Sequence, residues 1–121
     1  MLLRTRDVER VEPWILADDA DLHAPELLDF EVLATLRRRE QRRELEPRRA
    51  VQALADLRDL PISLYPLRPL LDRAWDLRAN IGAADGLYAA LAQALGAALL
   101  TTDRGFARAL EAQTSLVTIL P

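Results

Sequence analysis

Three acidic side chains, Glu31, Asp85 and Asp103, occupy positions where a protein can use carboxylates for chemistry. Asp85 lies near the start of the helical run 84–95. Asp103 directly follows 97–102, a nearly all-apolar segment typical of a strand buried on both faces. In open α/β sheets, ligands bind at the carboxyl ends of the strands. Two acids from separated positions that both face this edge suggest a metal site.

Glu31 belongs to the longest helix that the sequence predicts, 25–43. It follows two leucines of the apolar side by three and four residues, so we expect it to face the core. A carboxylate in that position is costly unless a positive charge compensates it. The apolar side of this helix comprises Leu27, Leu28, Leu33 and Leu36, with Val32 at its border.

Carboxylates that are brought together repel one another unless a cation is present. Oxygen ligands suit Mg²⁺ or Mn²⁺. Such an ion can activate a water molecule and stabilise the charge that develops on a phosphodiester. The chain has no Cys and no Lys, so thiolate chemistry and lysine-dependent mechanisms are excluded, whereas hydrolysis assisted by a metal ion is not.

Each acid also has a structural explanation. Asp103 stands between a strand and a helix, where Asp is an ordinary N-cap. Asp85 near a helix start interacts favourably with the helix dipole without any ligand. Glu31 could pair with a buried arginine. The combination of three acids is more specific than any one of them, but spacing alone does not bring them together.

Two further features have simple explanations beside functional ones. His23 is the one histidine, and we interpret it as structural because no second nitrogen or sulfur ligand is available. All sixteen basic residues are Arg, and seven of them lie between Arg37 and Arg49. Such a cluster is usually a solvated helix face, although it can also contact RNA phosphates.

Length and composition predict one cytosolic domain. The chain has 121 residues and a net charge of −3, and half of its residues are hydrophobic. No apolar run is long enough to cross a membrane, and the N-terminal residues 1–14 are too charged for a signal peptide.

Strands and helices alternate along the sequence, which predicts an α/β fold with a mainly parallel sheet. The expected strands are 22–24, 62–65, 97–102 and 116–120. The expected helices are 2–16, 25–43, 47–59, 70–78, 84–95 and 104–112, with Gly96 as a C-cap. Two of these helices have apolar positions that we expect to pack: Ala50, Val51, Leu54 and Leu57 in one, and Leu71, Ala74, Trp75 and Leu77 in the other.

The motifs APELLDFEVLATLRR and ADGLYAALAQALGAALLTTDRGFAR resemble a PIN domain of the VapC toxin group, and the resemblance runs from about Leu2 to the C-terminus. It implies a three-layer α/β/α fold and a Mg²⁺-dependent endoribonuclease toxin, with Mn²⁺ as a possible substitute. The family's acids fall on Glu31, Asp85 and Asp103, which would hold the metal. The resemblance also implies an RNA substrate, a VapB-like antitoxin as partner, and a homodimer.

One departure from that pattern concerns the N-terminal residues. PIN domains of this group open with a central strand that ends in an Asp, but residues 1–5 match the helix that follows it. Asp7, Asp18 and Asp19 follow no apolar strand. We therefore expect the first strand to be absent, through a misassigned start or a true truncation. For this form we expect weak or absent metal binding and nuclease activity.

Two other functions remain as alternatives. A catalytically silent PIN remnant could still bind an antitoxin or a partner subunit. A phosphoacceptor receiver domain would share the α/β layers, but it requires a pair of acids after an early strand and a late lysine, and neither is present.

Overall fold

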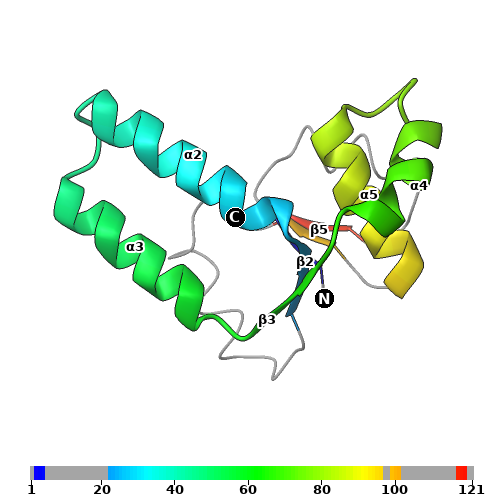
Figure 1. Cartoon of the computed structure of the whole chain (residues 1–121), viewed down its shortest axis with the longest axis horizontal. Coiled ribbons are helices and arrows are strands. Elements are labelled where there is room, and N and C mark those ends of the chain that lie inside the picture. Colours follow the sequence, from blue (N-terminus) through cyan, green and yellow to red (C-terminus); the bar gives the residue numbers. More distant parts are fainter. Residues whose placement is uncertain (1, 5–21, 97–98, 102–116, 120–121) are drawn as a thin grey trace.

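Five parallel strands form one sheet in the computed structural model, which describes residues 2–4, 22–96, 99–101 and 117–119 (Figure 1). The strand order is β3-β2-β1-β4-β5. The strands are β1 (Leu2–Arg4), β2 (Leu22–Pro25), β3 (Ile62–Tyr65), β4 (Leu99–Thr101) and β5 (Val117–Ile119). The described helices are α2 (Leu27–Gln41), α3 (Pro47–Asp59), the short 3₁₀ helix η2 (Arg68–Leu70), α4 (Leu71–Asp76) and α5 (Ala83–Leu95).

The predicted α/β class and parallel sheet are confirmed. All four described strand pairings are parallel. Helices lie on either side of the strands, with the α2–α3 hairpin on one side and the α4–α5 pair on the other (Figure 1). Parallel strands need crossover connections, and α2–α3 and α5 supply them between consecutive strands.

The prediction that the central strand is absent was wrong for this structure. Residues 2–4, which the helical pattern of 2–16 assigned to a helix, form β1 in the middle of the sheet. Leu2 pairs with His23 on one side and with Leu99 on the other. A strand with partners on both edges gains ladder hydrogen bonds that a local helical pattern does not reveal, so tertiary pairing overrides local periodicity. The remainder of the predicted helix lies outside the described residues.

The other predicted elements agree with the structure within a few residues where it describes them. The strand expected at 22–24 extends to Pro25, and those at 62–65, 97–102 and 116–120 contain β3, β4 and β5. The helix expected at 70–78 is shorter, because it begins as η2 and ends at Asp76. Gly96 caps α5 in the left-handed conformation, with φ of 59°, as predicted. The helix expected at 104–112 lies outside the described residues.

Helix α2 buries a narrower stripe than we predicted. Leu28, Val32 and Leu36, spaced by four residues, are buried against β2 and α3. Leu33 was expected in this stripe, but it is 52% exposed. The buried stripe follows the i, i+4 ridge of the helix, and Leu33 lies beside this ridge, on the solvent-exposed side of the helix.

Two other packing predictions failed for exposed positions. Val51 of α3 and Trp75 of α4 are 65% and 66% exposed, and Leu71 is also exposed. The guanidinium of Arg78 lies 4.4 Å from the centroid of the Trp75 ring, a cation–π contact that covers part of the indole. These side chains are therefore surface features rather than core.

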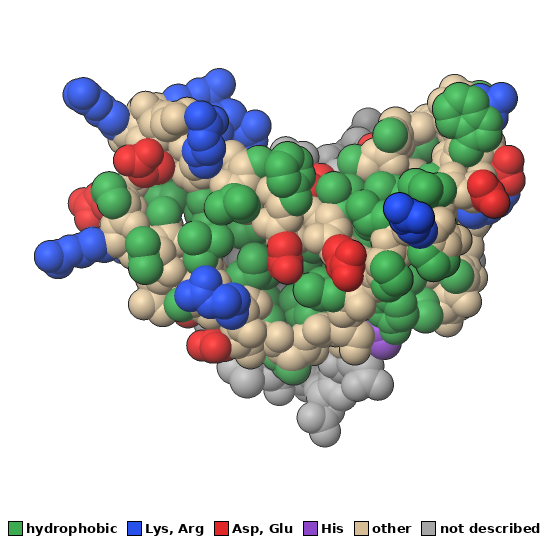
Figure 2. Space-filling view, viewed as in Figure 1, with side chains coloured by type: hydrophobic (Ala, Val, Ile, Leu, Met, Phe, Trp, Pro, Cys, Tyr) green, Lys and Arg blue, Asp and Glu red, His purple; other side chains and the backbone are tan. Residues whose placement is uncertain are grey.

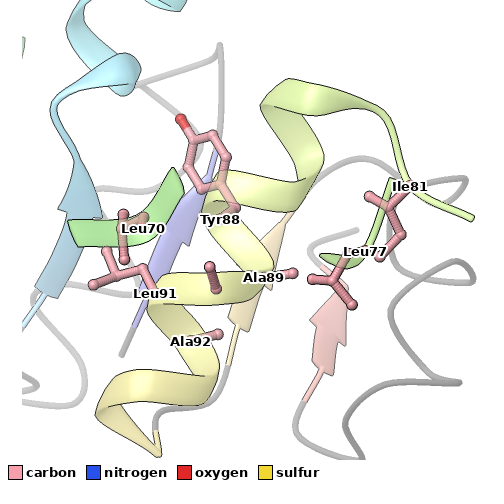
Figure 3. Close-up of a cluster of buried hydrophobic side chains, with 8 residues drawn as sticks. Leu70, Leu77, Ile81, Tyr88, Ala89, Leu91 and Ala92 are labelled. Atoms are coloured by element: carbon pink, nitrogen blue, oxygen red, sulfur yellow. The ribbon is translucent and has the colours of Figure 1, made fainter. Parts of the chain in front are cut away.

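Helices α4 and α5 approach each other closely at Gly86. A Cβ atom at this position would meet the backbone oxygen of Ala74 at 3.3 Å, so glycine permits the close approach. The resulting cluster buries Leu70, Leu77, Ile81, Tyr88, Ala89, Ala90, Leu91 and Ala92 (Figure 3). None of the described helices has the length and apolar character to cross a membrane.

Candidate active site

The candidate site lies at the edge where the strands end. The chain builds β1, β2 and β3 in one direction across the sheet and then returns to place β4 on the other side of β1. This reversal makes a switch point between β1 and β4, where open α/β sheets bind ligands. Helix α2 starts just after β2, and α5 ends just before β4, so both helix N-termini lie toward this edge.

Glu31 lies in the second turn of α2, on the flank beside the buried stripe. Leu27, one turn earlier, packs partly against the cluster around α5, whereas Leu28 packs against α3 and β2. Glu31 therefore faces α5 and is half-buried rather than enclosed in the core. The prediction that Glu31 points inward is therefore correct for its direction, but its side chain is only half-buried.

Asp85 lies in the first turn of α5 and is also half-buried. The positive end of the helix dipole favours a carboxylate there. Gly82, the N-cap of α5, offers no side chain to the backbone N–H groups of that turn. The first turn of α5 thus places a carboxylate in the positive field of the helix N-terminus.

A hydrogen bond from Tyr88 connects these two elements. The Tyr88 hydroxyl donates to Glu31 Oε1 at 2.6 Å, across 57 residues of sequence. Tyr88 follows Asp85 by three residues, so the two side chains are neighbours on the same face of α5. The structure therefore brings Glu31 to the helix face that carries Asp85.

Tyr88 is the functional candidate that the sequence analysis missed, although it belongs to the quoted motif Asp85-Gly86-Leu87-Tyr88. A signal was present. A tyrosine hydroxyl among the alanines and leucines of a helix that packs into the interior needs a buried partner. The sequence does not reveal which acceptor, 57 residues away, that partner would be.

Asp103, the third predicted acid, lies outside the described residues. Within the ranges that the structure describes, no three His, Cys, Asp or Glu side chains form a group able to hold a metal ion. Of the three predicted acids, only Glu31 and Asp85 can therefore be placed.

His23 of β2 makes a hydrogen bond to Tyr65 of the neighbouring strand β3. Its Nδ1 lies 2.7 Å from the Tyr65 hydroxyl, and the two rings are 5.6 Å apart between centroids. His23 is half-buried in β2, and Tyr65 ends β3. This hydrogen bond agrees with the structural role that we predicted for His23.

Arginines dominate the outer end of the α2–α3 hairpin. Figure 2 shows basic side chains gathered over this region of the molecule. The exposed members are Arg37, Arg38, Arg39, Arg42, Arg43, Arg48 and Arg49. The cluster is a solvated surface, as expected, and it adjoins a surface pocket lined by Phe30, Leu33, Ala34, Arg37, Arg38 and Gln41.

Comparison with known proteins identifies the class to which this fold and this pair of acids belong. The PIN domain family matches residues 1–111, so the chain belongs to the PIN domain family. The resemblance and the PIN-like fold class that we inferred from the motifs are thereby confirmed.

Among individual proteins, the chain is similar to bacterial VapC ribonucleases. It is 40% identical over 100 residues to VapC ribonuclease Mb0985 of Mycobacterium bovis, an alignment that covers 83% of this chain and 78% of that protein. Ribonuclease VapC9 of Mycobacterium tuberculosis matches to the same extent. Ribonuclease VapC12 of Mycobacterium tuberculosis is 35% identical over 82 residues, covering 68% of this chain and 64% of that protein.

Proposed function

We propose that this protein is a Mg²⁺-dependent endoribonuclease, the toxin of a VapBC-type toxin–antitoxin system, and that it acts in the cytoplasm. The observation that carries the proposal is the Tyr88–Glu31 hydrogen bond, which holds one predicted acid against the helix that presents another. The names of the similar proteins support ribonuclease chemistry.

The donor chemistry of the site fits a hard divalent cation. Glu31 and Asp85 provide carboxylate oxygens, and Asp103, which follows β4 by two residues in the sequence, is the third proposed ligand. Bound by these residues, Mg²⁺ would supply an activated water and stabilise charge on the phosphodiester. Mn²⁺ has compatible ligand preferences and is the practical probe.

The residues of the chain would orient the RNA and the acids. The half-buried setting of Glu31 and Asp85 limits competing water and strengthens their attraction for a cation. The arginine surface of the α2–α3 hairpin can neutralise RNA phosphates without reading their sequence. In this proposal, the arginines hold the RNA backbone and the acids define the position of cleavage.

The same protein is proposed to bind a VapB-like antitoxin and to form a homodimer. Two exposed apolar surfaces support protein partners. A groove of about 420 Å³ is lined mainly by Leu33, Leu54, Leu57, Leu60, Ile62 and Leu64. On the other side, Leu71 and Trp75 expose apolar surface on α4. Contiguous exposed apolar surface of this kind often marks an interaction site.

A catalytically silent binding protein is the second candidate, and one observation favours it. The central strand β1 ends in Arg4, whereas the pattern that the motifs resemble has a carboxylate at the end of this strand. An arginine at that position would not serve as a metal ligand, and its positive charge would disfavour the binding of a metal ion nearby. Such a protein would bind its partner without cleaving RNA.

Cleavage assays with acid variants test the proposed function. Single-stranded RNA is incubated with the purified protein and Mg²⁺ or Mn²⁺. Glu31→Gln and Asp85→Asn should each lower kcat/KM by more than about 100-fold. Loss of a residue that only hydrogen-bonds to a metal ligand typically lowers activity by about 10- to 100-fold, and loss of the ligand itself should lower it further. The control is Asp72→Asn on the exposed surface of α4, which should retain full activity.

The two candidate functions give opposite results in this assay. Cleavage that depends on the divalent ion and on both acids supports the ribonuclease. No cleavage at any Mg²⁺ or Mn²⁺ concentration, together with retained binding of the antitoxin in a pull-down, supports the silent binding protein. Equal Mn²⁺ affinity in wild type and Asp85→Asn would remove Asp85 from the site.

A further inference from the structure

Tyr88 is the most completely buried large side chain near the candidate site. Its exposed fraction is 0%, and its ring packs in the cluster formed by Leu70, Leu77, Ile81 and neighbouring residues of α5. The hydroxyl points away from the aliphatic side chains of this cluster (Figure 3). A ring held in this way has little freedom, because interiors pack as densely as organic crystals.

The length of the contact indicates a strong hydrogen bond. The distance of 2.6 Å between Tyr88 Oη and Glu31 Oε1 falls in the range of O–H···O⁻ bonds to a charged acceptor. Glutamate has three side-chain torsions and, when half-exposed, samples many rotamers. The rigid phenol therefore restricts the positions that this carboxylate can adopt.

The position that Tyr88 selects is set by α5. Asp85 precedes Tyr88 by one helical turn, and both belong to the same rigid element. Because Tyr88 holds Glu31 against α5, it restrains the Glu31 carboxylate relative to the helical turn that carries Asp85. Metal affinity depends on such preorganisation, since ligating carboxylates are normally oriented by hydrogen bonds from neighbouring groups.

We propose that Tyr88 is a positioning residue, which orients the Glu31 carboxylate for a divalent cation shared with Asp85. This inference rests on the proposed metal-dependent function and assigns a role to a residue outside the acidic set. The competing explanation is purely structural: Glu31 satisfies the hydroxyl of a buried tyrosine, and the bond contributes only to stability. The two explanations differ in what happens to metal affinity.

The first measurement is Mn²⁺ binding, followed by the electron paramagnetic resonance signal of free Mn²⁺. Tyr88→Phe should bind Mn²⁺ about 10- to 100-fold more weakly than wild type. Tyr65→Phe is the matched control, because it removes the same hydroxyl from the hydrogen bond to His23 and should leave affinity unchanged. In a Glu31→Gln background, Tyr88→Phe should have almost no additional effect, as expected for two members of one interaction.

A second measurement does not require the Tyr88→Phe protein to fold. The chain has two tyrosines, Tyr65 and Tyr88, so Tyr65→Phe protein grown with 3-fluorotyrosine carries a single fluorine label at position 88. Addition of Mg²⁺ should shift this ¹⁹F resonance when Glu31 is present. The shift should disappear in the Glu31→Gln variant, which lacks the charged link between the tyrosine and the ion.

The outcomes separate this inference from the proposed function. Unchanged Mn²⁺ affinity in a folded Tyr88→Phe protein, or a ¹⁹F resonance that does not respond to saturating Mg²⁺, overturns the role of Tyr88 while wild-type metal binding and cleavage stand. Failure of the wild-type protein to bind Mn²⁺ overturns both proposals. Weaker binding in Tyr88→Phe, but not in Tyr65→Phe, supports the positioning role.

Discussion

The two tyrosines of this chain make the same kind of contact in different settings. Tyr88 is fully buried and donates to the carboxylate of Glu31, whereas Tyr65 is half-buried and bonds to the His23 ring. Hydrogen bonds to charged groups contribute more to stability than neutral ones, and groups left unpaired in the interior are costly. We therefore expect the two hydroxyls, although chemically identical, to contribute unequally to the free energy of unfolding.

Removal of each hydroxyl should reveal this difference in the free energy of unfolding. We expect Tyr88→Phe to lose about 1.5 to 3 kcal/mol and Tyr65→Phe about 0.5 to 1.5 kcal/mol, from the charged and neutral partners respectively. Urea denaturation of the metal-free proteins measures both values. Equal losses would contradict the expected difference between the two contacts.

Helix α5 contacts several of the described elements. It covers β1 and β2, packs closely on α4 through Gly86, and carries Asp85 and Tyr88 on one face. Its C-terminal end depends on Gly96, which adopts φ of 59°. Side chains with a Cβ rarely adopt this conformation, so the stop between α5 and β4 relies on glycine.

A substitution at this stop tests the element directly. Gly96→Ala should destabilise the protein by about 1 kcal/mol, because alanine is strained at positive φ. Among the described residues, no heavy atom other than those of Gly96 and its chain neighbours lies within 4 Å of the position that a Cβ would occupy, so the cost would come from the backbone and not from a clash. Gly96→Asn is the graded control, because Asn tolerates the left-handed region and should cost less. Thermal denaturation of both variants measures these costs. An alanine variant as stable as wild type would contradict the expectation that position 96 requires glycine.

On the scale of the whole molecule, the described residues form two separate hydrophobic clusters. One cluster joins β2, α2 and α3, and the other joins η2, α5 and residues 77–81, which follow α4. The Tyr88–Glu31 bond crosses between an element of each. Charge is also unevenly distributed, because seven exposed arginines gather at the outer end of the α2–α3 hairpin (Figure 2). In the proposed function, this basic surface holds the RNA backbone while the acids define the position of cleavage.

The salt dependence of RNA binding tests whether the arginine surface contacts RNA. Replacing Arg38 and Arg42 together by Gln should weaken RNA binding at low salt and reduce the slope of log K against log salt concentration by about 0.7 for each lost phosphate contact on a single strand. Arg68→Gln, exposed on η2, is the control and should leave the slope unchanged. Fluorescence anisotropy with labelled RNA between 50 and 200 mM salt, about the range over which such effects are large, measures it. An unchanged slope in the double variant would exclude these arginines from the RNA surface.

The sequence by itself determined the parts of the protein that depend on local pattern. Apolar segments with turn residues located β2, β3, β4 and β5, and Gly96 marked the end of α5. Local spacing also placed Asp85 in a first helical turn and directed Glu31 toward the interior, although the structure leaves Glu31 half-buried. The motifs around these acids were sufficient to indicate the PIN family.

The tertiary structure decided what depends on contacts between distant residues. Residues 2–4 follow a helical pattern, yet they form the central strand, because pairing with β2 and β4 satisfies both of its edges. Leu33, Val51 and Trp75 are apolar, yet they are exposed, because only one ridge of each helix meets a partner. The Tyr88–Glu31 bond spans 57 residues, and periodicity carries no information about which side chains meet across such a separation.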